Sequence, residues 1–446
     1  MAAFMLLIGR VYTFYSPKWV FFGIIVIFEI GSVICGAAPT SKAFIVGRAI
    51  SGFGAAGMMN GAIVIMVNVI PLAKRPVYQG IFGSVFAIAS VAGPLLGGAF
   101  TQKVSWRWCF YINLPIGAVT LAIVALVLKL PEQKTQKSLK EQFMQLDPIG
   151  TAFFLPGVIC LLLALQWGGS TYAWNNGRII ALLVIFGVCL CAFVTVQVWL
   201  GDMVTVPPRI IKQRSIAAAV WFSLCVGGLM LAVVYFLPIW FQVIKDATPV
   251  HSGIMNLPTL LSLVVASMLS GIFVKKVGYY TPPLIACSVI MPIGLGLFTT
   301  FTPETGHAKW IGYQVIFGLG LGLGMQQASM AAQTVLPNKD VPTGVSLNFF
   351  AQQVGGTVFV SVGENVLVNK LVSGLADIPN FDPGAVVNTG ATEIKSVVPP
   401  QFLGVVKAVY NHALTEVFVV ALVLSCLTIF GALAIEWRNI KAQKDR

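Results

Sequence analysis

Long runs of apolar residues, separated by short polar segments, recur along the whole chain. Each run has about the twenty residues that a helix needs to cross the hydrocarbon of a bilayer. Twelve runs are predicted to span, at residues 20–38, 43–70, 77–100, 108–130, 149–167, 179–200, 216–242, 252–273, 283–301, 309–335, 343–368 and 415–436. They lack the alternating pattern of a membrane barrel. The pattern therefore predicts an all-α, polytopic protein embedded in the lipid bilayer.

The composition agrees with this prediction, because 57% of the 446 residues are hydrophobic and only 10% are charged. A soluble domain has roughly 25% charged residues. The net charge is +13, and most lysines and arginines fall in loops on one side of the predicted spans. Cytoplasmic loops of membrane proteins carry such an excess. The basic charge therefore indicates which side is cytoplasmic, and no nucleic-acid partner is expected.

The residue types that carry most enzyme chemistry are sparse and scattered. Eight cysteines and three histidines are present, and none of them has metal-ligand spacing. No catalytic nucleophile lies beside a candidate base. We expect no metal, no cofactor and no enzymatic activity.

Five positions recur in order, each 266 positions further on. Arg48, Gly52, Gly54, Pro71 and Pro76 are followed by Gln314, Gly318, Gly320, Pro337 and Pro342. Apolar spans arranged in two related halves are typical of secondary transporters, whose binding site lies where the halves meet. The repeat therefore predicts transport of a substrate across the membrane.

The repeat divides the chain into three parts. Residues 1–130 are predicted to form an N-terminal helical bundle and residues 215–446 a C-terminal one, with a long exterior loop at about 369–411. Residues 131–214 are predicted to be a linker with an inserted two-helix hairpin. The apolar segment 1–9 is too short to cross a bilayer, so it is interpreted as part of a span that begins before this sequence.

Two glycine-rich motifs lie inside predicted spans. The first, Gly52-x-Gly54-x-x-Gly57, matches a dinucleotide-binding pattern, but that pattern needs a preceding strand. We interpret it as a smooth helix face for close helix packing. In the second, Gly93-Pro94-x-x-Gly97-Gly98, the proline bends its helix and the glycines leave a groove. This motif predicts a hinge or a seal, with simple close packing as the alternative.

These motifs resemble those of a known family. Gly80 together with Gly93-Pro94-x-x-Gly97-Gly98 resembles the antiporter motif of drug/proton antiporters in the major facilitator superfamily. Phe44-x-x-x-Arg48-x-x-x-Gly52 resembles that superfamily's fourth-helix motif. Residues 105–115, SWRWCFYINLP, resemble the start of the sixth helix in its fourteen-helix drug efflux branch. The best match is the fungal multidrug and mycotoxin efflux group, with the first helix absent here.

The resemblance implies a monomer in the plasma membrane that exports hydrophobic small molecules by proton antiport with alternating access. Another carrier of the superfamily, for a siderophore or a nutrient, is an alternative, as is a non-transporting receptor or fragment. One motif departs from the family, because Thr13 replaces the aspartate of the cytoplasmic gating loop and Ser16 its second glycine. The charged latch that the family builds there is therefore not carried over to this chain.

Ionisable groups inside spans are costly to bury, which makes them functional candidates. The resemblance implies a role for Arg48 in proton coupling. Glu364 is a candidate proton acceptor, with a packing role as the alternative. Glu29 is a candidate for coupling, or alternatively for a hydrogen bond between helices.

The resemblance also implies which helices line a central cavity. Their polar and aromatic residues are the candidates for substrate contact: Asn60, Trp221, Phe222, Tyr235, Gln326 and Gln327. Met58 and Met59 would add compliant surface. Gln352 and Gln353 are expected at the interface between the halves.

Overall fold

The computed structural model describes residues 1–130, 146–169, 171–200, 204–376, 389, 394 and 398–442. Of Val91, Pro94, Leu95 and Gln102 only the backbone is described. The helices are α1 (Ala2–Phe14), α2 (Pro17–Ala37), α3 (Ser41–Val69), α4 (Arg75–Lys103), α5 (Trp108–Tyr111), α6 (Asn113–Leu126), α8 (Pro148–Trp167), α9 (Gly177–Leu200), α10 (Pro208–Ile211), α11 (Arg214–Ile244), α12 (Pro249–Met255), α13 (Leu257–Val277), α14 (Thr281–Phe298), α15 (His307–Gly324), α16 (Gln327–Val335), α17 (Val341–Leu375) and α20 (Leu403–Ala434), with a short 3₁₀ helix at Leu72–Lys74.

The predicted all-α, polytopic fold is confirmed. Within the described residues, 11 helical segments are long and apolar enough to cross a membrane. They coincide with eleven of the twelve predicted spans, and the 29-residue helix α4 occupies the position of the twelfth. Helix α1 has 13 residues, which is too few to cross a bilayer.

Two helix ends and two helix interruptions differ from the sequence prediction. Helix α17 continues to Leu375 and α20 begins at Leu403, so both ends of the predicted 369–411 loop are helical. These polar ends lengthen the two helices, and the added turns pack together where Gly374 lies against Val409. The predicted spans 252–273 and 309–335 are each interrupted, at Asn256 and at Met325-Gln326 respectively.

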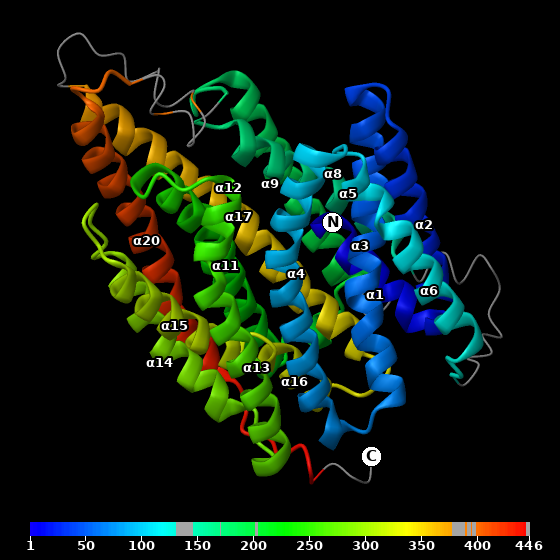
Figure 1. Ribbon diagram of the computed structural model, residues 1–446. Helices are drawn as coiled ribbons and strands as arrows, with labels where there is room; N and C mark the ends of the chain where they lie inside the picture. The colour runs from blue at the N-terminus through cyan, green and yellow to red at the C-terminus, as the bar shows by residue number, and fades with distance from the viewer. Residues whose placement is uncertain are drawn as a thin grey trace.

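The helices form two groups that lie side by side (Figure 1). Helices α1, α2, α3 and α6 make up one group, and α11, α13 to α17 and α20 make up the other. Helix α4 packs against α13 of the second group, and the two groups meet where α1 packs against α17. The hairpin α8–α9 adds contacts to both α1 and α17.

The repeated positions occupy equivalent places in the two groups. Pro76 is the second residue of α4, and Pro342 is the second residue of α17. A Cβ atom added to Gly54 would meet Phe28 on α2. One added to Gly320 would meet Met291 on α14 in the same way.

A buried carboxylate anchors the inserted hairpin at the end predicted to be cytoplasmic. Asp147 is 1% exposed and precedes α8. Its oxygens accept hydrogen bonds from the Gly150 N–H at 2.7 Å, the Gln197 amide at 2.7 Å, and both the N–H and hydroxyl of Thr205 at 2.9 Å. Four donors offset the desolvation of the carboxylate, so this cluster joins both hairpin helices to the linker.

Candidate functional site

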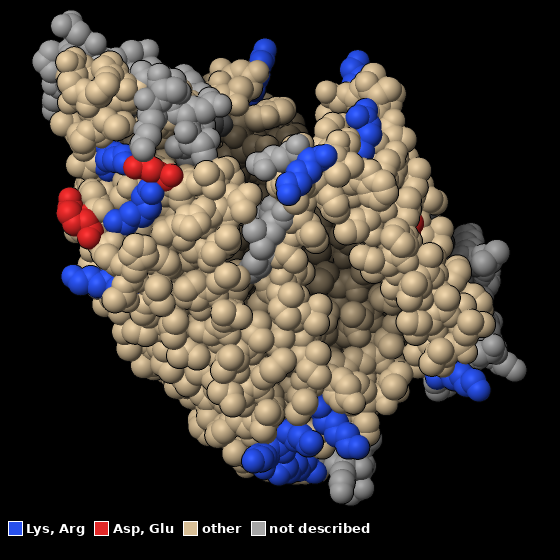
Figure 2. Space-filling model, viewed as in Figure 1, with Lys and Arg blue, Asp and Glu red and all other residues tan. Residues whose placement is uncertain are grey.

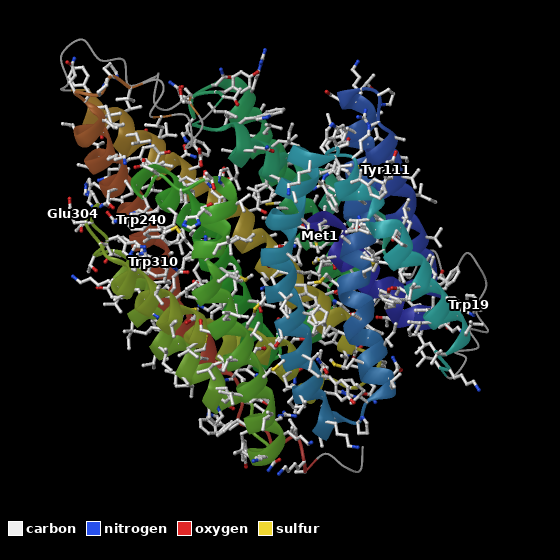
Figure 3. The ribbon with its side chains drawn as sticks, in the orientation of Figure 1. Met1, Trp19, Tyr111, Trp240, Glu304 and Trp310 are labelled. Carbon is white, nitrogen blue, oxygen red and sulfur yellow. The ribbon has the colours of Figure 1, made fainter. Side chains whose placement is uncertain are left out.

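A cavity lies between the two groups of helices, near the middle of the bundle. Its lining comes from α1, α3, α4, α11, α17 and the α15–α16 segment, at Met5, Met59, Phe82, Phe86, Ser223, Gly227, Met230, Leu231, Met325, Gln326, Ala328, Ser329, Asn348, Phe349, Gln352 and Gln353. Met1 lies nearby, at the centre of Figure 3. The side-chain amide of the lining residue Gln353 donates a hydrogen bond to the Met1 sulfur at 3.2 Å. The cavity is thus built by both groups.

A second cavity adjoins the first, and the two share Phe86 and Met230. Their volumes are about 60 and 100 Å³. A cavity of about 150 Å³ admits benzene, so a larger molecule enters only if flexible side chains move aside. Four methionines line the first cavity, and methionine adapts its shape readily.

The lining is interrupted by a break in a helix. Helix α15 ends at Gly324 and α16 begins at Gln327, and both residues of the break, Met325 and Gln326, line the cavity. Broken helices are typical of transporter binding sites, because they expose side chains and backbone to the ligand. Glycines at alternate positions from Gly318 to Gly324 precede the break and weaken the helix.

Those glycines also bring neighbouring helices close. A Cβ atom on Gly318 would meet the Thr259 backbone of α13, whereas one on Gly320 would meet the Met291 backbone of α14. The prediction that such glycines permit close helix contact is confirmed. On α3, Gly54 and Gly57 likewise face α2.

At the predicted cytoplasmic end, α4 is packed tightly against α13. A Cβ atom added to Gly80 would lie 2.7 Å from the backbone oxygen of Ser267. The Ser267 hydroxyl donates to the Gly80 carbonyl at 3.3 Å. Gly271, one turn further along α13, lies directly on the Pro76 backbone. This contact leaves no room for a side chain.

The other contact at this end joins α1 to α17 through small and hydroxyl-bearing residues. Gly9 lies against Ser346, and the hydroxyls of Thr13 and Thr343 are 3.5 Å apart. Thr13 thus meets the first turn of α17 with a neutral group, in place of the family's aspartate.

A charged contact reaches the same helix from the linker. The Arg209 guanidinium donates two hydrogen bonds to the Asp340 carboxylate, at 2.6 and 2.8 Å. Asp340 directly precedes α17, and its side chain is 7% exposed. The ion pair therefore ties the linker to the start of α17.

The opposite half of α4 is not packed in this way. Cβ atoms added to Gly93 or Gly97 would meet nothing within 4 Å, and one on Gly98 would meet only Val250 at 3.4 Å. Figure 2 shows the surface hollowed between the two groups from the upper end, opposite the densest group of Lys and Arg. The molecule is thus closed at the predicted cytoplasmic end and open at the opposite end.

The predicted substrate residues are not all at the cavity. Gln326 lines it, whereas Phe222 is buried against Gly324 and Gly431. The Trp221 indole N–H donates to the Leu427 carbonyl at 3.0 Å, on α20.

The other three predicted residues lie outside its lining as well. Asn60 donates to the Met5 carbonyl at 3.0 Å, and Gln327 donates to the Ser270 hydroxyl at 2.9 Å. Tyr235 lies one turn beyond Leu231 and is 49% exposed.

Other cavity residues were expected elsewhere or not singled out at all. Met59 lines the cavity and Met58 does not; Gln352 and Gln353, expected at the interface between the halves, also line it. Sequence reasoning missed Asn348, Phe82 and Phe86. The four-residue spacing of Phe82 and Phe86 places both on one face of α4, which is the signal that could have found them.

The three ionisable candidates lie apart. Glu364 on α17 is close enough to Tyr235 and Tyr410 for its charge to act on both hydroxyls. Arg48 is exposed on α3. The Glu29 carboxylate lies directly on Gly117 of α6, and its Oε2 atom has no hydrogen-bond partner among the described residues.

Comparison with known proteins gives a consistent result. A family model described as Major Facilitator Superfamily matches residues 1–360. The MFS-type transporter VdtG of Byssochlamys spectabilis is 55% identical over 99% of this chain and 80% of its own length. Efflux pump aflT of Aspergillus parasiticus is 48% identical, over 99% and 87%. The rubrofusarin-specific efflux pump aurT of Gibberella zeae is 47% identical, over 99% and 81%.

Two solved structures have a similar fold at low sequence identity. The human organic anion transporter MFSD10 matches with a TM-score of 0.58 and 11% identity, covering 95% of this chain and 80% of its own. The nucleoside transporter NupG matches with a TM-score of 0.51 and 11% identity, covering 97% and 90%.

Proposed function

The chain belongs to the major facilitator superfamily, and we propose that it exports hydrophobic small molecules by proton antiport with alternating access. As a member of this family it is an integral, multi-pass membrane transporter rather than an enzyme. Fungal relatives that it matches over nearly its whole length are named efflux pumps, which supports the outward direction. We further propose that it acts as a monomer in the plasma membrane.

The unequal closure of the two ends carries this proposal. Gly80 on α4 is in backbone contact with α13 at the predicted cytoplasmic end, while Gly93 and Gly97 on the same helix face open space. A carrier that alternates needs such a state and its opposite, in which the exterior half of α4 closes. The glycines of the antiporter motif would then serve as the surface of the exterior seal.

Proton coupling is assigned to Glu364 and Arg48. Glu364 lies eleven residues, or about three turns, from the cavity residue Gln353 toward the open end. Its neighbour Tyr235, whose hydroxyl is close enough to feel the Glu364 charge, is 49% exposed. A proton loads Glu364 from the exterior and leaves it on the cytoplasmic side, which resets the carrier. Arg48 responds to the change in charge through the helices between them.

Efflux from cells that lack other drug pumps tests this function. Yeast expressing the chain are loaded with 2-naphthol, a neutral and hydrophobic fluorescent dye, and retention is followed with and without a protonophore. We expect the chain to speed dye loss, and the protonophore to abolish the effect. A rate of dye loss that is the same with and without the protonophore would contradict proton antiport. No dye loss despite confirmed surface expression would contradict export of hydrophobic molecules in general.

A further inference from the structure

One polar group in the central cavity is held in place without a partner. Asn348 on α17 is 3% exposed, and its Nδ2 donates to the Ala328 carbonyl at 3.0 Å. That bond sets the orientation of the amide and directs Oδ1 away from Ala328. Oδ1 has no hydrogen-bond partner among the described residues. A buried acceptor of this kind is costly unless a water molecule or a ligand supplies a donor.

The surroundings of Asn348 are aromatic and compliant. Phe349 is its neighbour on α17, and Phe82 and Phe86 line the same cavity from α4. Methionines from α1, α3, α11 and the α15–α16 break complete the apolar lining. Phenyl faces and thioethers favour flat aromatic rings, because both make favourable contacts with ring edges and faces.

The cavity also lacks charge. No Lys, Arg, Asp, Glu or His is among the described residues that line either of the two adjoining cavities. The polar groups present in the first are amides and hydroxyls, such as Gln326, Gln352 and Ser223. An ion transferred here from water would lose its hydration without gaining a counter-charge.

We propose that this cavity selects uncharged aromatic molecules that carry a hydroxyl group, and that Asn348 Oδ1 accepts the hydrogen bond from that hydroxyl. The inference rests on the proposed export function and names the chemistry of its substrate. Asn348 is thereby a specificity-determining residue. Molecules that match in ring size but lack the hydroxyl, or carry a permanent charge, bind less well.

Binding of three matched naphthalenes tests the inference. The full chain is reconstituted in lipid nanodiscs, and binding of 2-naphthol, 2-methoxynaphthalene and trimethyl(2-naphthyl)ammonium is measured by equilibrium dialysis against empty nanodiscs. We expect 2-naphthol to bind about tenfold more tightly than its methyl ether, as one buried hydrogen bond allows. The ammonium compound is expected to bind more weakly than both. Equal affinity for the phenol and ether, or tight binding of the cation, would overturn the inference.

Substitutions assign the preference to a residue. Asn348→Leu is expected to bind 2-naphthol and the ether with affinities within about twofold of each other. Asn369→Leu makes the same change at an exposed position of α17 and keeps the tenfold preference. Asn348→Ser disturbs packing less and replaces the leucine variant in this test if that variant does not fold. It too is expected to lower the ratio of the affinity for 2-naphthol to the affinity for the ether. An unchanged ratio in a folded Asn348 variant would refute the assignment.

The readout separates this inference from the proposed function. Binding to nanodiscs needs no proton gradient, whereas the dye-efflux assay does. A phenol preference without efflux would count against export alone. Efflux without that preference would count against the substrate class alone.

Discussion

Replacing Gly97 by leucine tests whether the exterior half of α4 must pack against a neighbour during the cycle. In the outward-open structure a Cβ atom at Gly97 meets nothing within 4 Å. The larger side chain therefore fits this state without a clash, and leucine favours a helix over glycine by roughly 1 kcal/mol. We expect the thermal unfolding temperature of Gly97→Leu to be equal to or slightly above that of the wild type.

Gly97→Leu should raise the free energy of the protein only in the state in which the exterior end is closed. Overpacking of a tight contact costs about 1–3 kcal/mol. Since 1.4 kcal/mol is tenfold in an equilibrium constant, the closed state would lose about five- to 150-fold in population. Export needs that state in each cycle, so the efflux rate is expected to fall by about fivefold or more.

Two further substitutions make the result specific. Gly80→Leu at the closed end places a Cβ atom 2.7 Å from the Ser267 backbone oxygen, so it is expected to lower the unfolding temperature itself. Gly312→Leu on α15 adds a side chain where nothing lies within 4 Å, as at Gly97, but outside the motif. It should leave efflux unchanged, with an unfolding temperature equal to or slightly above that of the wild type, as for Gly97→Leu.

The assay is dye efflux normalised to the amount of protein at the cell surface, with unfolding temperatures measured on purified protein. Wild-type efflux by Gly97→Leu would refute the reasoning, because the exterior half of α4 would then never become a tight contact. Loss of efflux with a lowered unfolding temperature would point to misfolding instead, and would equally remove the support for a seal.

Arg48→Ala is expected to abolish proton-driven export without lowering the unfolding temperature. Lys42→Ala on the same helix is the control. Normal gradient-driven efflux by Arg48→Ala would count heavily against a role of Arg48 in proton coupling. Glu364→Gln removes a titrating group, so the dependence of the efflux rate on external pH is expected to flatten, and a pH profile identical to wild type would exclude Glu364 as the proton acceptor. Asp147→Ala leaves several buried donors without an acceptor and is expected to destabilise the protein by about 1–3 kcal/mol, measured as a lower unfolding temperature. Asp147→Asn keeps one acceptor oxygen and should destabilise the protein less. Equal unfolding temperatures of the wild type and both variants would contradict the anchoring role.

Much of the fold could be predicted from the sequence because spanning a bilayer leaves few choices. Length and apolarity of each run determine a helix. The 266-residue repeat predicted two related halves, and the repeated prolines Pro76 and Pro342 are each the second residue of a long helix. The break at Met325-Gln326 was not predicted, since the run 309–335 is apolar enough overall to be taken as one span and glycine is common in membrane helices. The helical ends at Leu375 and Leu403 were missed because polar turns outside the hydrocarbon resemble a loop in composition.

The cavity lining was predicted poorly for a physical reason. A membrane helix is apolar on every side, so its hydrophobic pattern does not tell a lipid-facing side from one that faces a cavity. Three consecutive residues show this: Trp221 reaches α20, Phe222 is buried against Gly324 and Gly431, and Ser223 lines the cavity. Successive residues are about 100° apart around a helix, and only packing decides which of them faces inward.

The sequence by itself therefore determined the number and order of the spans, the relation between the halves, and the glycines that permit close approach. The rotation of each helix, the neutral contact of Thr13 with Thr343, and the Asn348 oxygen that no described residue pairs with were decided by tertiary structure alone. These features depend on which surfaces meet, and contacts between residues more than three hundred positions apart leave no local pattern in the chain.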